Sequence, residues 1–420
     1  MKITVLAPYL PHRNVGHGSG IAARDLVTSL ARVHEVQVIA LIRPGEEKLT
    51  GQVADLGVTV VPVPFADKTA TGTARVPLYR DRLAALGRSL VSGYPMFVEK
   101  YWSPHLARRI AEAVTAFAPD AVHVEALQMA LHVRDLRRRR DEGAGKRPRL
   151  VLNSIELGSL PRERRALRAG DPITRAVARF EAAAWRRLQV DTTAWADRTL
   201  CVTPEDHVLY ENMGGRGLIT VPIGMDLDHI RADWAPGTAE KYLFVGSYRH
   251  RPNRLAVDIL LDQVWPVVRK QRPAAQLLLV GRGLDEYLAA KGAAASWNDQ
   301  GVTALGFVED LTPVFRDCRL FLAPLPEGGG IKIKILEAMA RGIPVITTPI
   351  GAEGITGAAD DAIVIAACDE RFTAAVLDAA ASPAAAAARA RRARTLMEEK
   401  FSWSAIVKKL TGIYAGQDAD

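Results

Sequence analysis

The sequence predicts an α/β protein with two doubly wound domains, each a parallel sheet covered by helices on both faces. Short runs rich in Val, Ile and Leu alternate with helix-length amphipathic segments along the whole 420-residue chain. The apolar runs are continuous, which is typical of strands buried on both faces of a parallel sheet. The alternation stops at residues 221–241, which are rich in Pro, Gly and Asp, and then begins again. That segment therefore reads as a linker between two domains.

In the first half, apolar runs predict strands at 2–8, 35–42, 58–64, 120–127, 149–156 and 199–203. Helical spacing predicts helices at 20–33 and 103–117, and a long charged stretch of roughly 160–196 closes this half. We expect the first domain to cover 1–222, joined by a C-terminal helix at about 401–420.

In the second half, the predicted strands are 241–247, 275–281, 302–308, 319–325, 344–350 and 362–366. A helix is expected at 254–268, and the alanine-rich segment 383–416 consists of strong helix formers. We expect the second domain to cover 223–400. In sheets of this kind, ligands bind beyond the carboxyl ends of the strands.

The composition excludes several classes of protein. Apolar residues make up 48% and charged residues 24% of the chain, which is ordinary for a globular protein. The three cysteines, Cys201, Cys318 and Cys368, are too few and too widely spaced for a disulfide scaffold or a zinc cluster. No apolar run reaches transmembrane length and the start lacks the features of a secretory signal, so we expect a cytoplasmic protein.

Positive charge is concentrated in the first half. Residues 1–200 hold 31 Lys and Arg against 20 Asp and Glu, whereas residues 201–420 hold 24 against 27. The densest basic cluster lies between Arg134 and Arg149, where Arg137 to Arg140 are consecutive. It is either a solvated helix end or a surface that attracts an anionic acceptor or membrane. Aromatic residues are not interleaved with it, so nucleic acid is not an expected partner.

The segment 324–355 carries the clearest chemistry. Three glycines follow an apolar run and precede a helical pattern: Gly328, Gly329 and Gly330. Glycines let a backbone approach a phosphate closely, and the N–H groups at a helix start attract the anion. Lys332 and Lys334 are unfavourable at the positive end of a helix by themselves. We therefore interpret them as pyrophosphate ligands, with Glu337 placed to accept hydrogen bonds from ribose hydroxyls.

Residues 324–355 resemble the signature of glycosyltransferase family 4 and its group 1 relatives. Further similar stretches cover most of the chain: 16–38, 118–130, 244–268, 277–283 and 302–325. The resemblance implies the GT-B fold, in which two Rossmann-like domains face each other across a cleft. It also implies a retaining, metal-independent transfer of a sugar from a nucleotide-sugar donor, bound mainly by the second domain, to an acceptor on the first.

The sequence departs from the family pattern at two places. Many members carry two glutamates seven residues apart here, and the position that pairs with Glu337 is Gly329. Glu327 substitutes for the missing glutamate only if the loop bends differently. Many members also place a histidine near the donor sugar, and this position aligns with Glu125, while His123 lies two residues earlier on the same strand face. Both stay open as catalytic candidates, together with Lys334.

The remaining donor-binding candidates lie in loops that follow predicted strands. A backbone cradle from the first domain, with Gly18, Ser19 and Gly20, precedes a helix. In the second domain the candidates are Gly246, Arg249, Arg251, Arg282, Val308 and Ile331. Arg249 or Arg251 is expected to clamp the pyrophosphate, and Asn253 to cap the following helix. The pair Asp226 and Asp228 mimics a metal-binding motif, but its place in the linker argues against a metal.

We conclude that the sequence predicts a hexosyltransferase-type glycosyltransferase (EC 2.4) with no cofactor and a nucleotide-sugar co-substrate, with UDP as the expected nucleotide. The alternatives are another enzyme of the same fold, such as a sugar-nucleotide epimerase or a phosphorylase, and a non-catalytic basic binding protein. The excess of positive charge in the first domain suits a phosphate-bearing or lipid-linked acceptor and a peripheral contact with anionic membrane. No amphipathic helix with large aromatic anchors is evident.

Overall fold

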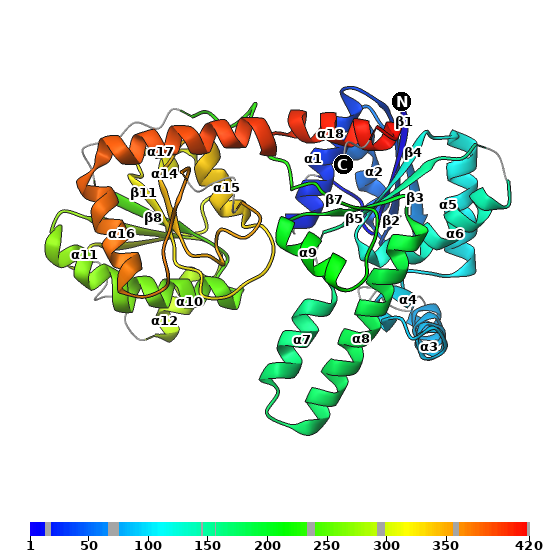
Figure 1. Ribbon diagram of the computed structural model, residues 1–420, viewed down its shortest axis with the longest axis horizontal. Helices are drawn as coiled ribbons and strands as arrows, with labels where there is room; N and C mark the ends of the chain where they lie inside the picture. The colour runs from blue at the N-terminus through cyan, green and yellow to red at the C-terminus, as the bar shows by residue number, and fades with distance from the viewer. Residues whose placement is uncertain are drawn as a thin grey trace. The chain divides into compact units, whose positions relative to one another are not determined.

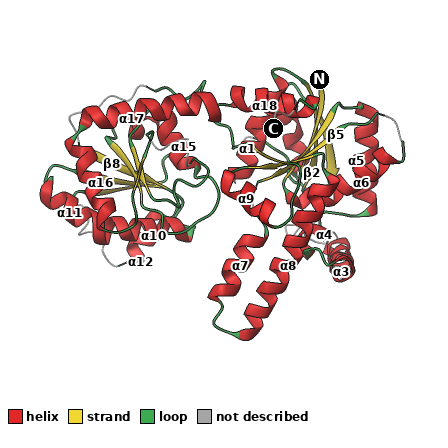
Figure 2. Cartoon of the chain, viewed as in Figure 1, coloured by secondary structure: helices red, strands yellow, loops and turns green. Residues whose placement is uncertain are grey.

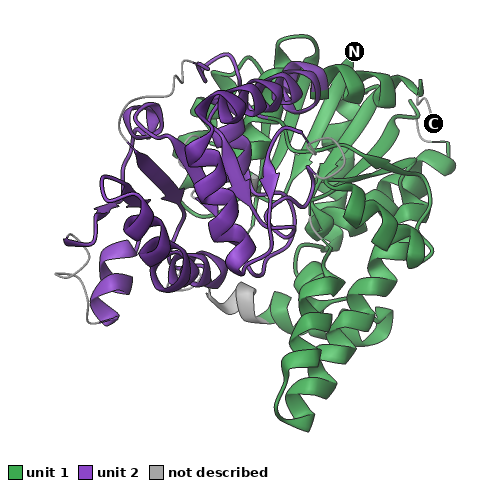
Figure 3. Cartoon of the chain, turned by 60° about the vertical axis from the view of Figure 1, so that its left-hand side comes forward, with its two compact units in different colours: residues 1–224, 406–420 green, residues 225–405 purple. Residues whose placement is uncertain are grey.

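The computed structural model describes residues 1–12, 18–65, 75–143, 146–155, 157–232, 240–291, 299–355 and 361–417, without the side chains of 18–19 and 75–79. The chain forms two compact units (Figure 3). Unit 1 is Met1–Gly224 with Ile406–Asp420, and unit 2 is Met225–Ala405. The sequence placed these boundaries after residue 222 and near residue 400.

Unit 1 contains a seven-stranded parallel sheet in the order β3-β2-β1-β4-β5-β6-β7. The order reverses between β1 and β4, which creates a crevice at the carboxyl ends of these two strands. The strands are β1 (Lys2–Ala7), β2 (Glu35–Ile42), β3 (Thr59–Pro64), β4 (Ala121–Glu125), β5 (Arg149–Ser154), β6 (Arg198–Cys201) and β7 (Leu218–Thr220). Six of them match predicted runs, and only the short edge strand β7 went unpredicted.

Helices pack on the sheet of unit 1, as Figure 2 shows. They cover the apolar strands, and this arrangement confirms the predicted doubly wound class. Their bounds are α1 (Gly18–Ala31), α2 (Thr50–Ala54), α3 (Arg75–Ser92), α4 (Met96–Glu99), α5 (Pro104–Phe117), α6 (Ala130–Asp141), α7 (Ser159–Arg168), α8 (Pro172–Trp195) and α9 (Pro204–Asn212). Short 3₁₀ turns occupy Glu46–Leu49 and Leu127–Met129.

The predicted long helical stretch at 160–196 is two antiparallel helices, α7 and α8, that form a hairpin. The chain turns at 169–171, where Asp171 caps α8 by accepting a hydrogen bond from the Thr174 N–H at 2.7 Å. Pro172 follows at the first helical position, where its missing N–H costs nothing. The Gly-Asp-Pro sequence at 170–172 is a helix-start signal that the prediction of one continuous stretch overlooked.

Unit 2 contains a six-stranded parallel sheet in the order β10-β9-β8-β11-β12-β13. This order again reverses in the middle, between β8 and β11. The strands are β8 (Lys241–Val245), β9 (Gln276–Val280), β10 (Val302–Gly306), β11 (Leu320–Ala323), β12 (Val345–Thr347) and β13 (Val364–Ile365). The helices are α10 (Arg251–Ile259), α11 (Trp265–Gln271), α12 (Leu284–Ala290), α14 (Thr312–Arg316), α15 (Ile333–Ala340), α16 (Glu370–Ala381) and α17 (Pro383–Leu396).

The C-terminal helix α18 (Trp403–Ala415) follows a π-helical turn at Met397–Phe401 and belongs to unit 1 from Ile406 onward. Polar contacts hold it to the first sheet. The Lys409 Nζ donates to the Thr220 carbonyl at 2.8 Å, and His34 Nε2 lies 2.8 Å from the Thr411 hydroxyl. Among the described residues, no helix has both the length and the apolar character needed to cross a lipid bilayer.

Replacing Gly158 by Ala is expected to destabilise unit 1. A Cβ atom at this position would lie 2.0 Å from Cε3 of Trp185, a buried indole between the helices of the hairpin. Relieving such overpacking typically costs about 1–3 kcal/mol. Urea unfolding followed by tryptophan fluorescence measures the loss.

Gly170→Ala in the turn of the same hairpin is the matched control. A Cβ there meets no atom within 4 Å, so the free energy of unfolding should change by less than about 0.5 kcal/mol. Equal destabilisation by the two substitutions would contradict the packing argument.

Candidate functional site

The polar groups of unit 2 converge where the sheet order reverses, at the carboxyl ends of β8 and β11. Gly246 directly follows β8, and Lys334 lies in the first turn of α15, which begins after the loop that leaves β11. The Lys334 Nζ donates a hydrogen bond to the Asn253 Oδ1 and lies 4.7 Å from the centre of the Phe244 ring. The Asn253 Nδ2 donates to the Ser247 carbonyl at 2.8 Å, which holds the amide in place.

Two glycines allow this close approach. A Cβ at Gly246 would lie 2.8 Å from the Asn253 Cγ and 2.9 Å from the Lys334 Nζ. Gly281, which follows β9, has φ +144° and would bring a Cβ within 1.9 Å of the Gly246 carbonyl oxygen. Neither position accepts a side chain without displacement of the backbone or of Lys334.

Lys334 is held in an environment that opposes its charge. Burial, and then the positive charge of Lys332, lower the pKa of Lys334 to about 7. Its described partners are a neutral amide oxygen and an aromatic face, neither of which is an anion. An anion placed beside the ammonium group would raise this pKa again, so the site is arranged to gain a proton when it binds negative charge.

The glycine-rich loop lies next to Lys334. Gly328 and Gly330 have φ values of +144° and +67°, which favour glycine, and Gly329 between them is exposed. Lys332 is the N-cap residue of α15 and directs its Nζ to the Gly330 carbonyl and, at 3.3 Å, to the Glu353 carboxylate. The predicted phosphate cradle therefore has its glycines and both lysines at one end of one helix.

Three other predicted residues of this unit, Glu327, Arg251 and Glu337, are held in ion pairs. Glu327 pairs with Arg251, the first residue of α10, so the two candidates face each other. Glu337 accepts a hydrogen bond from the Arg341 guanidinium at 3.0 Å, one turn further along α15. Arg249 is exposed near Gly283 and shows no contact with the Lys334 cluster.

Of the remaining donor candidates of unit 2, Arg282 and Val308 lie around the end of β10, and Ile331 lies in the glycine-rich loop before α15. The Arg282 guanidinium stacks 4.4 Å from the centre of the Phe307 ring, which is 61% exposed. Val308 and Ile331 are partly buried and pack against the core of the unit. An exposed aromatic ring beside an arginine offers a face on which a planar group can stack.

In unit 1, His123 and Glu125 form one buried network at the carboxyl end of β4. His123 Nε2 lies 3.1 Å from the Glu125 Oε1, and Nδ1 lies 2.7 Å from the Tyr414 hydroxyl of α18. The Asn153 Nδ2 donates to both carboxylate oxygens of Glu125, at 3.3 and 3.1 Å. Burial, and then the charge of Glu125, hold the pKa of Tyr414 well above its usual value, so this phenol stays protonated.

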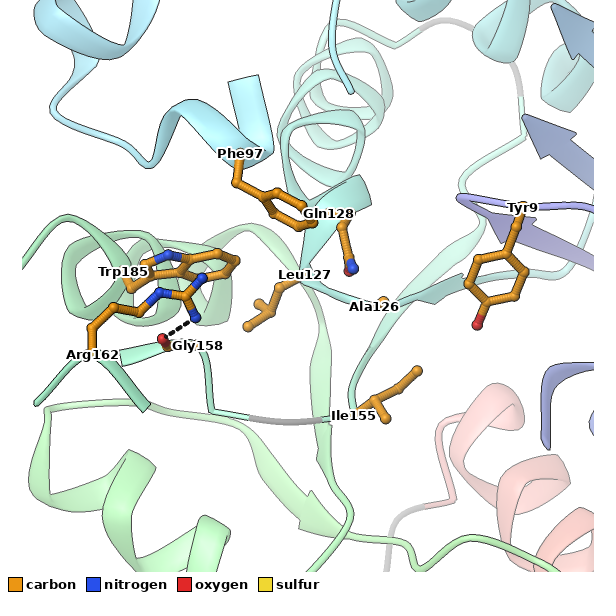
Figure 4. A pocket seen from close by; sticks show the side chains of 9 residues that line it. All are labelled: Tyr9, Phe97, Ala126, Leu127, Gln128, Ile155, Gly158, Arg162 and Trp185. Carbon is orange, nitrogen blue, oxygen red and sulfur yellow. Dashed lines mark hydrogen bonds between the residues drawn. The ribbon is translucent and has the colours of Figure 1, made fainter. Parts of the chain in front are cut away.

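A pocket of about 220 Å³ opens beside this network (Figure 4). Ala126, which directly follows Glu125, lines it with φ +69° and ψ 150°, a conformation that costs an alanine about 1–3 kcal/mol. The Arg162 guanidinium lies over the Trp185 ring at 4.7 Å and donates to the Gly158 carbonyl at 2.8 Å. The other lining residues are Tyr9, Phe97, Leu127, Gln128 and Ile155.

The predicted backbone cradle of unit 1 lies at the start of α1. Gly18, Ser19 and Gly20 are the first three residues of this helix, and the side chains of the first two lie outside the described residues. The helix starts two residues earlier than predicted. Gly18, Ser19 and Gly20 therefore belong to the helix and do not form a loop before it. Asp226 Oδ2 lies 2.8 Å from His229 Nδ1, and the described ranges contain no cluster of three metal-ligating side chains.

Sequence reasoning missed the part played by two residues. Asn253 was expected to cap α10, but His250 occupies the N-cap and Asn253 sits inside the helix, where it holds Lys334. Tyr414 carried no local signal, because it reaches His123 only through the return of the C-terminal helix. Asn253 stands out in the sequence as a polar residue at the start of a helix. Its partner could not be predicted, because Lys334 lies 81 residues further along the chain.

Substituting Lys334 by Met is expected to change how the stability of unit 2 depends on pH. The folded pKa of about 7 lies below the ordinary value of 10.5, so between these values the unfolded chain binds more protons. Stability of the native protein then rises with pH in this window, by at most about 1.4 kcal/mol per pH unit. Urea unfolding at several pH values from 6 to 9 should show this rise only with Lys334 present.

Lys241→Met is the matched control, since Lys241 lies at the opposite end of β8 and pairs with Asp317 at 3.1 Å. The change in the free energy of unfolding caused by Lys241→Met should be the same at pH 7 and at pH 9. A Lys334→Met effect that is constant across this range would refute the shifted pKa.

The second unit resembles known proteins in sequence. Residues 239–382 match the family Glycosyl transferases group 1. A phosphatidyl-myo-inositol mannosyltransferase of Mycobacterium tuberculosis is 30% identical over 144 residues, which are 33% of this chain and 36% of that protein. The chain thus spans about a third of the length of this curated relative.

Solved structures match almost the whole chain at low identity. Sucrose-phosphate synthase of Thermosynechococcus elongatus has a TM-score of 0.67 and 17% identity, with 99% of each chain covered. HepE of Anabaena, solved in complex with UDP, has a TM-score of 0.65 and 12% identity over 99% of this chain and 100% of that one. The second unit is therefore similar in sequence to the group 1 glycosyltransferases over residues 239–382, and the two Rossmann-like units have the GT-B fold of these solved structures.

Proposed function

We propose that the protein transfers a sugar from a nucleotide-sugar donor to an acceptor hydroxyl, with retention at the anomeric carbon and without a metal ion. The observation that carries this proposal is Lys334, a half-buried ammonium group without an anionic partner among its described contacts, held at the switch point of unit 2. It lies inside the segment that matches the group 1 family. A diphosphate is the anion that a glycine-rich loop and a helix N-terminus suit best.

The chemistry that these residues can supply is stabilisation of a leaving group. When the bond between sugar and diphosphate breaks, negative charge grows on the diphosphate oxygens. Lys334 and Lys332 are close enough to the helix start to share this charge, and the N–H groups of Ile333 and Lys334 precede the first backbone hydrogen bond of α15, from the Ile335 N–H to the Lys332 carbonyl at 2.8 Å. Departure and attack on the same face would then retain the configuration.

Recognition of the rest of the donor is assigned to the neighbouring groups. Glu337 would accept hydrogen bonds from the ribose hydroxyls, and these would replace the hydrogen bond that it now accepts from Arg341. Phe307, with Arg282 stacked on it, offers a face for the base near Val308. We propose a UDP-linked donor, which agrees with the UDP bound by HepE of Anabaena.

The acceptor is assigned to the pocket of unit 1. At about 220 Å³ it is smaller than the roughly 300–1,000 Å³ of a drug-sized ligand site, so it fits one ring-sized group. Its aromatic walls and the amide of Gln128 suit a sugar or polyol, which stacks through C–H groups and bonds through hydroxyls. A lipid-linked, phosphate-bearing acceptor is supported by the Mycobacterium tuberculosis relative, whose name states a phosphatidyl-myo-inositol substrate.

The basic cluster between Arg134 and Arg149 gives little support to a membrane contact. The Arg140 guanidinium bonds both oxygens of Asp197, and Arg137 bonds Asp141 at 2.9 Å. Arg138 bonds Glu142, also at 2.9 Å. Internal ion pairs therefore neutralise three of the four consecutive arginines, 137–140.

Substituting Lys334 by Met is expected to lower donor turnover by about 10²-fold or more, because one preorganised electrostatic contact is lost. The same substitution should remove most of the thermal stabilisation by nucleoside diphosphates, which reaches about 2.7 kcal/mol at 100 times the dissociation constant. The measurements are a thermal-shift panel with UDP, GDP, ADP and dTDP, and release of the diphosphate from the corresponding sugar donors.

Lys241→Met is again the control, and it should leave both readouts unchanged. Wild-type turnover by Lys334→Met would overturn the site. Conversion of the donor to an isomeric nucleotide sugar without any acceptor would identify an epimerase, and salt-sensitive binding of polyanions without any diphosphate effect would identify a binding protein.

The acceptor class predicts how the labelled product distributes between solvents. With a radiolabelled sugar donor, wild-type protein and a membrane extract, we expect the label to enter the butanol phase, because a lipid-linked product is apolar. Lys334→Met should give no such product. Label that stays in the aqueous phase would show a water-soluble acceptor and would refute the lipid-linked one.

A further inference from the structure

The hairpin of α7 and α8 projects from unit 1, and its turn at 169–171 forms the distal end (Figure 1). Its base is well packed. Trp185 is buried against Gly158, and the Gln189 Oε1 accepts a hydrogen bond from the Ser159 N–H at 2.9 Å. The base therefore holds the two helices rigidly while their distal halves extend into solvent.

Large apolar side chains are exposed on this distal half. Leu167 of α7 is 84% exposed, and three residues of α8 are exposed as well: Ile173 (77%), Val177 (48%) and Phe180 (65%). The spacing of the three α8 residues, i, i+4 and i+7, places them on one face of the helix. Single exposed apolar residues are normal, but a stripe on a projecting element marks an interaction surface.

Between the distal helices lies a shallow groove of about 400 Å³. Small side chains form its floor, because Ala166 of α7 faces Ala182 and Ala183 of α8. Arg179 lines it together with Arg186, which lies 3.4 Å from the carboxylate of Glu163 in the same groove, and Leu167 lines its outer end. Apolar walls beside guanidinium groups match the junction between the acyl chains and the phosphate of a phospholipid.

The charge of the hairpin is strongly positive. Residues 159–195 hold eight arginines and no lysine against four carboxylates. Two of these carboxylates bridge the helices, since Arg186 lies 3.4 Å from Glu163 and Arg165 lies 3.8 Å from Glu181. Two copies of such a surface repel each other, whereas an anionic lipid surface attracts it by about 1 kcal/mol per basic residue.

We propose that the distal half of the α7–α8 hairpin docks the protein on anionic phospholipid membranes. Leu167, Ile173 and Phe180 insert into the headgroup region, and Arg179 of the groove binds a lipid phosphate. An element with exposed apolar side chains and a basic surface lies in the interface and does not cross the bilayer. This inference goes beyond the proposed transfer reaction and does not depend on it.

The first test is sedimentation with vesicles in the absence of any nucleotide. The wild-type protein is expected to bind vesicles of phosphatidylcholine mixed with phosphatidylglycerol at low salt, and to bind less at high salt or without phosphatidylglycerol. Ile173→Ser with Phe180→Ser should lower the partition coefficient about tenfold or more. Arg179→Gln should lower it several-fold on anionic vesicles only, since one basic residue near such a surface contributes about 1 kcal/mol.

Leu83→Ser with Leu90→Ser on α3 is the matched control, because these leucines are exposed to a similar extent, 69% and 72%. This variant should bind vesicles like the wild type. No binding by the wild type at low salt, or equal loss in the α3 variant, would overturn the proposal. Self-association seen by light scattering and abolished by Ile173→Ser with Phe180→Ser would assign the stripe to a second copy and also overturn it.

A label at the turn tests insertion directly. Cys201 and Cys318 are buried, so Gly170→Cys in a Cys368→Ser background gives one reactive thiol for an environment-sensitive fluorophore. A blue shift of its emission with anionic vesicles is expected, and an unchanged spectrum on bound protein would refute insertion of the turn. Donor hydrolysis without vesicles should be the same in the hairpin variants as in the wild type, so failure of the docking proposal and failure of the donor site give different results.

Discussion

The position of Lys334 in unit 2 depends on the close approach of α15 to the end of β8. Gly246 leaves room for Lys334 and Asn253, and Gly281 leaves room for Gly246 itself. Because the ammonium group is confined between an amide oxygen and an aromatic ring, water cannot solvate it fully, and its pKa falls to about 7. The same burial that lowers the pKa of Lys334 means that a bound anion would raise this pKa and stabilise the charged ammonium group.

Unit 1 also buries polar side chains near the point where its strand order reverses, and there they form hydrogen bonds with one another. His123, Glu125, Asn153 and Tyr414 satisfy one another in a buried network. Glu125 of this network directly precedes Ala126, whose strained backbone lines the pocket of unit 1. The imidazole of His123 and the carboxylate of Glu125 are themselves almost fully buried.

The density of basic residues along the sequence does not show which of them are available to bind an anionic partner. The run of arginines at 137–140 is the most conspicuous basic feature of the sequence, yet ion pairs to residues such as Asp197 neutralise most of it. The hairpin has a less dense sequence pattern and also contains ion pairs, but it presents Arg179 beside the exposed Leu167. Surface charge is therefore better judged from pairing and neighbours than from density along the chain.

The sequence by itself determined the two parallel sheets, the glycine-rich loop and the lysines of α15, because apolar periodicity and glycine positions are local properties. It did not show the break at 169–171 clearly enough, and it could not show which residues surround Lys334 or His123. Asn253 lies 81 residues before Lys334, and Tyr414 lies 291 residues after His123. Only the tertiary structure decided these contacts, because burial, pKa and ion pairing depend on neighbours that folding brings together from distant parts of the chain.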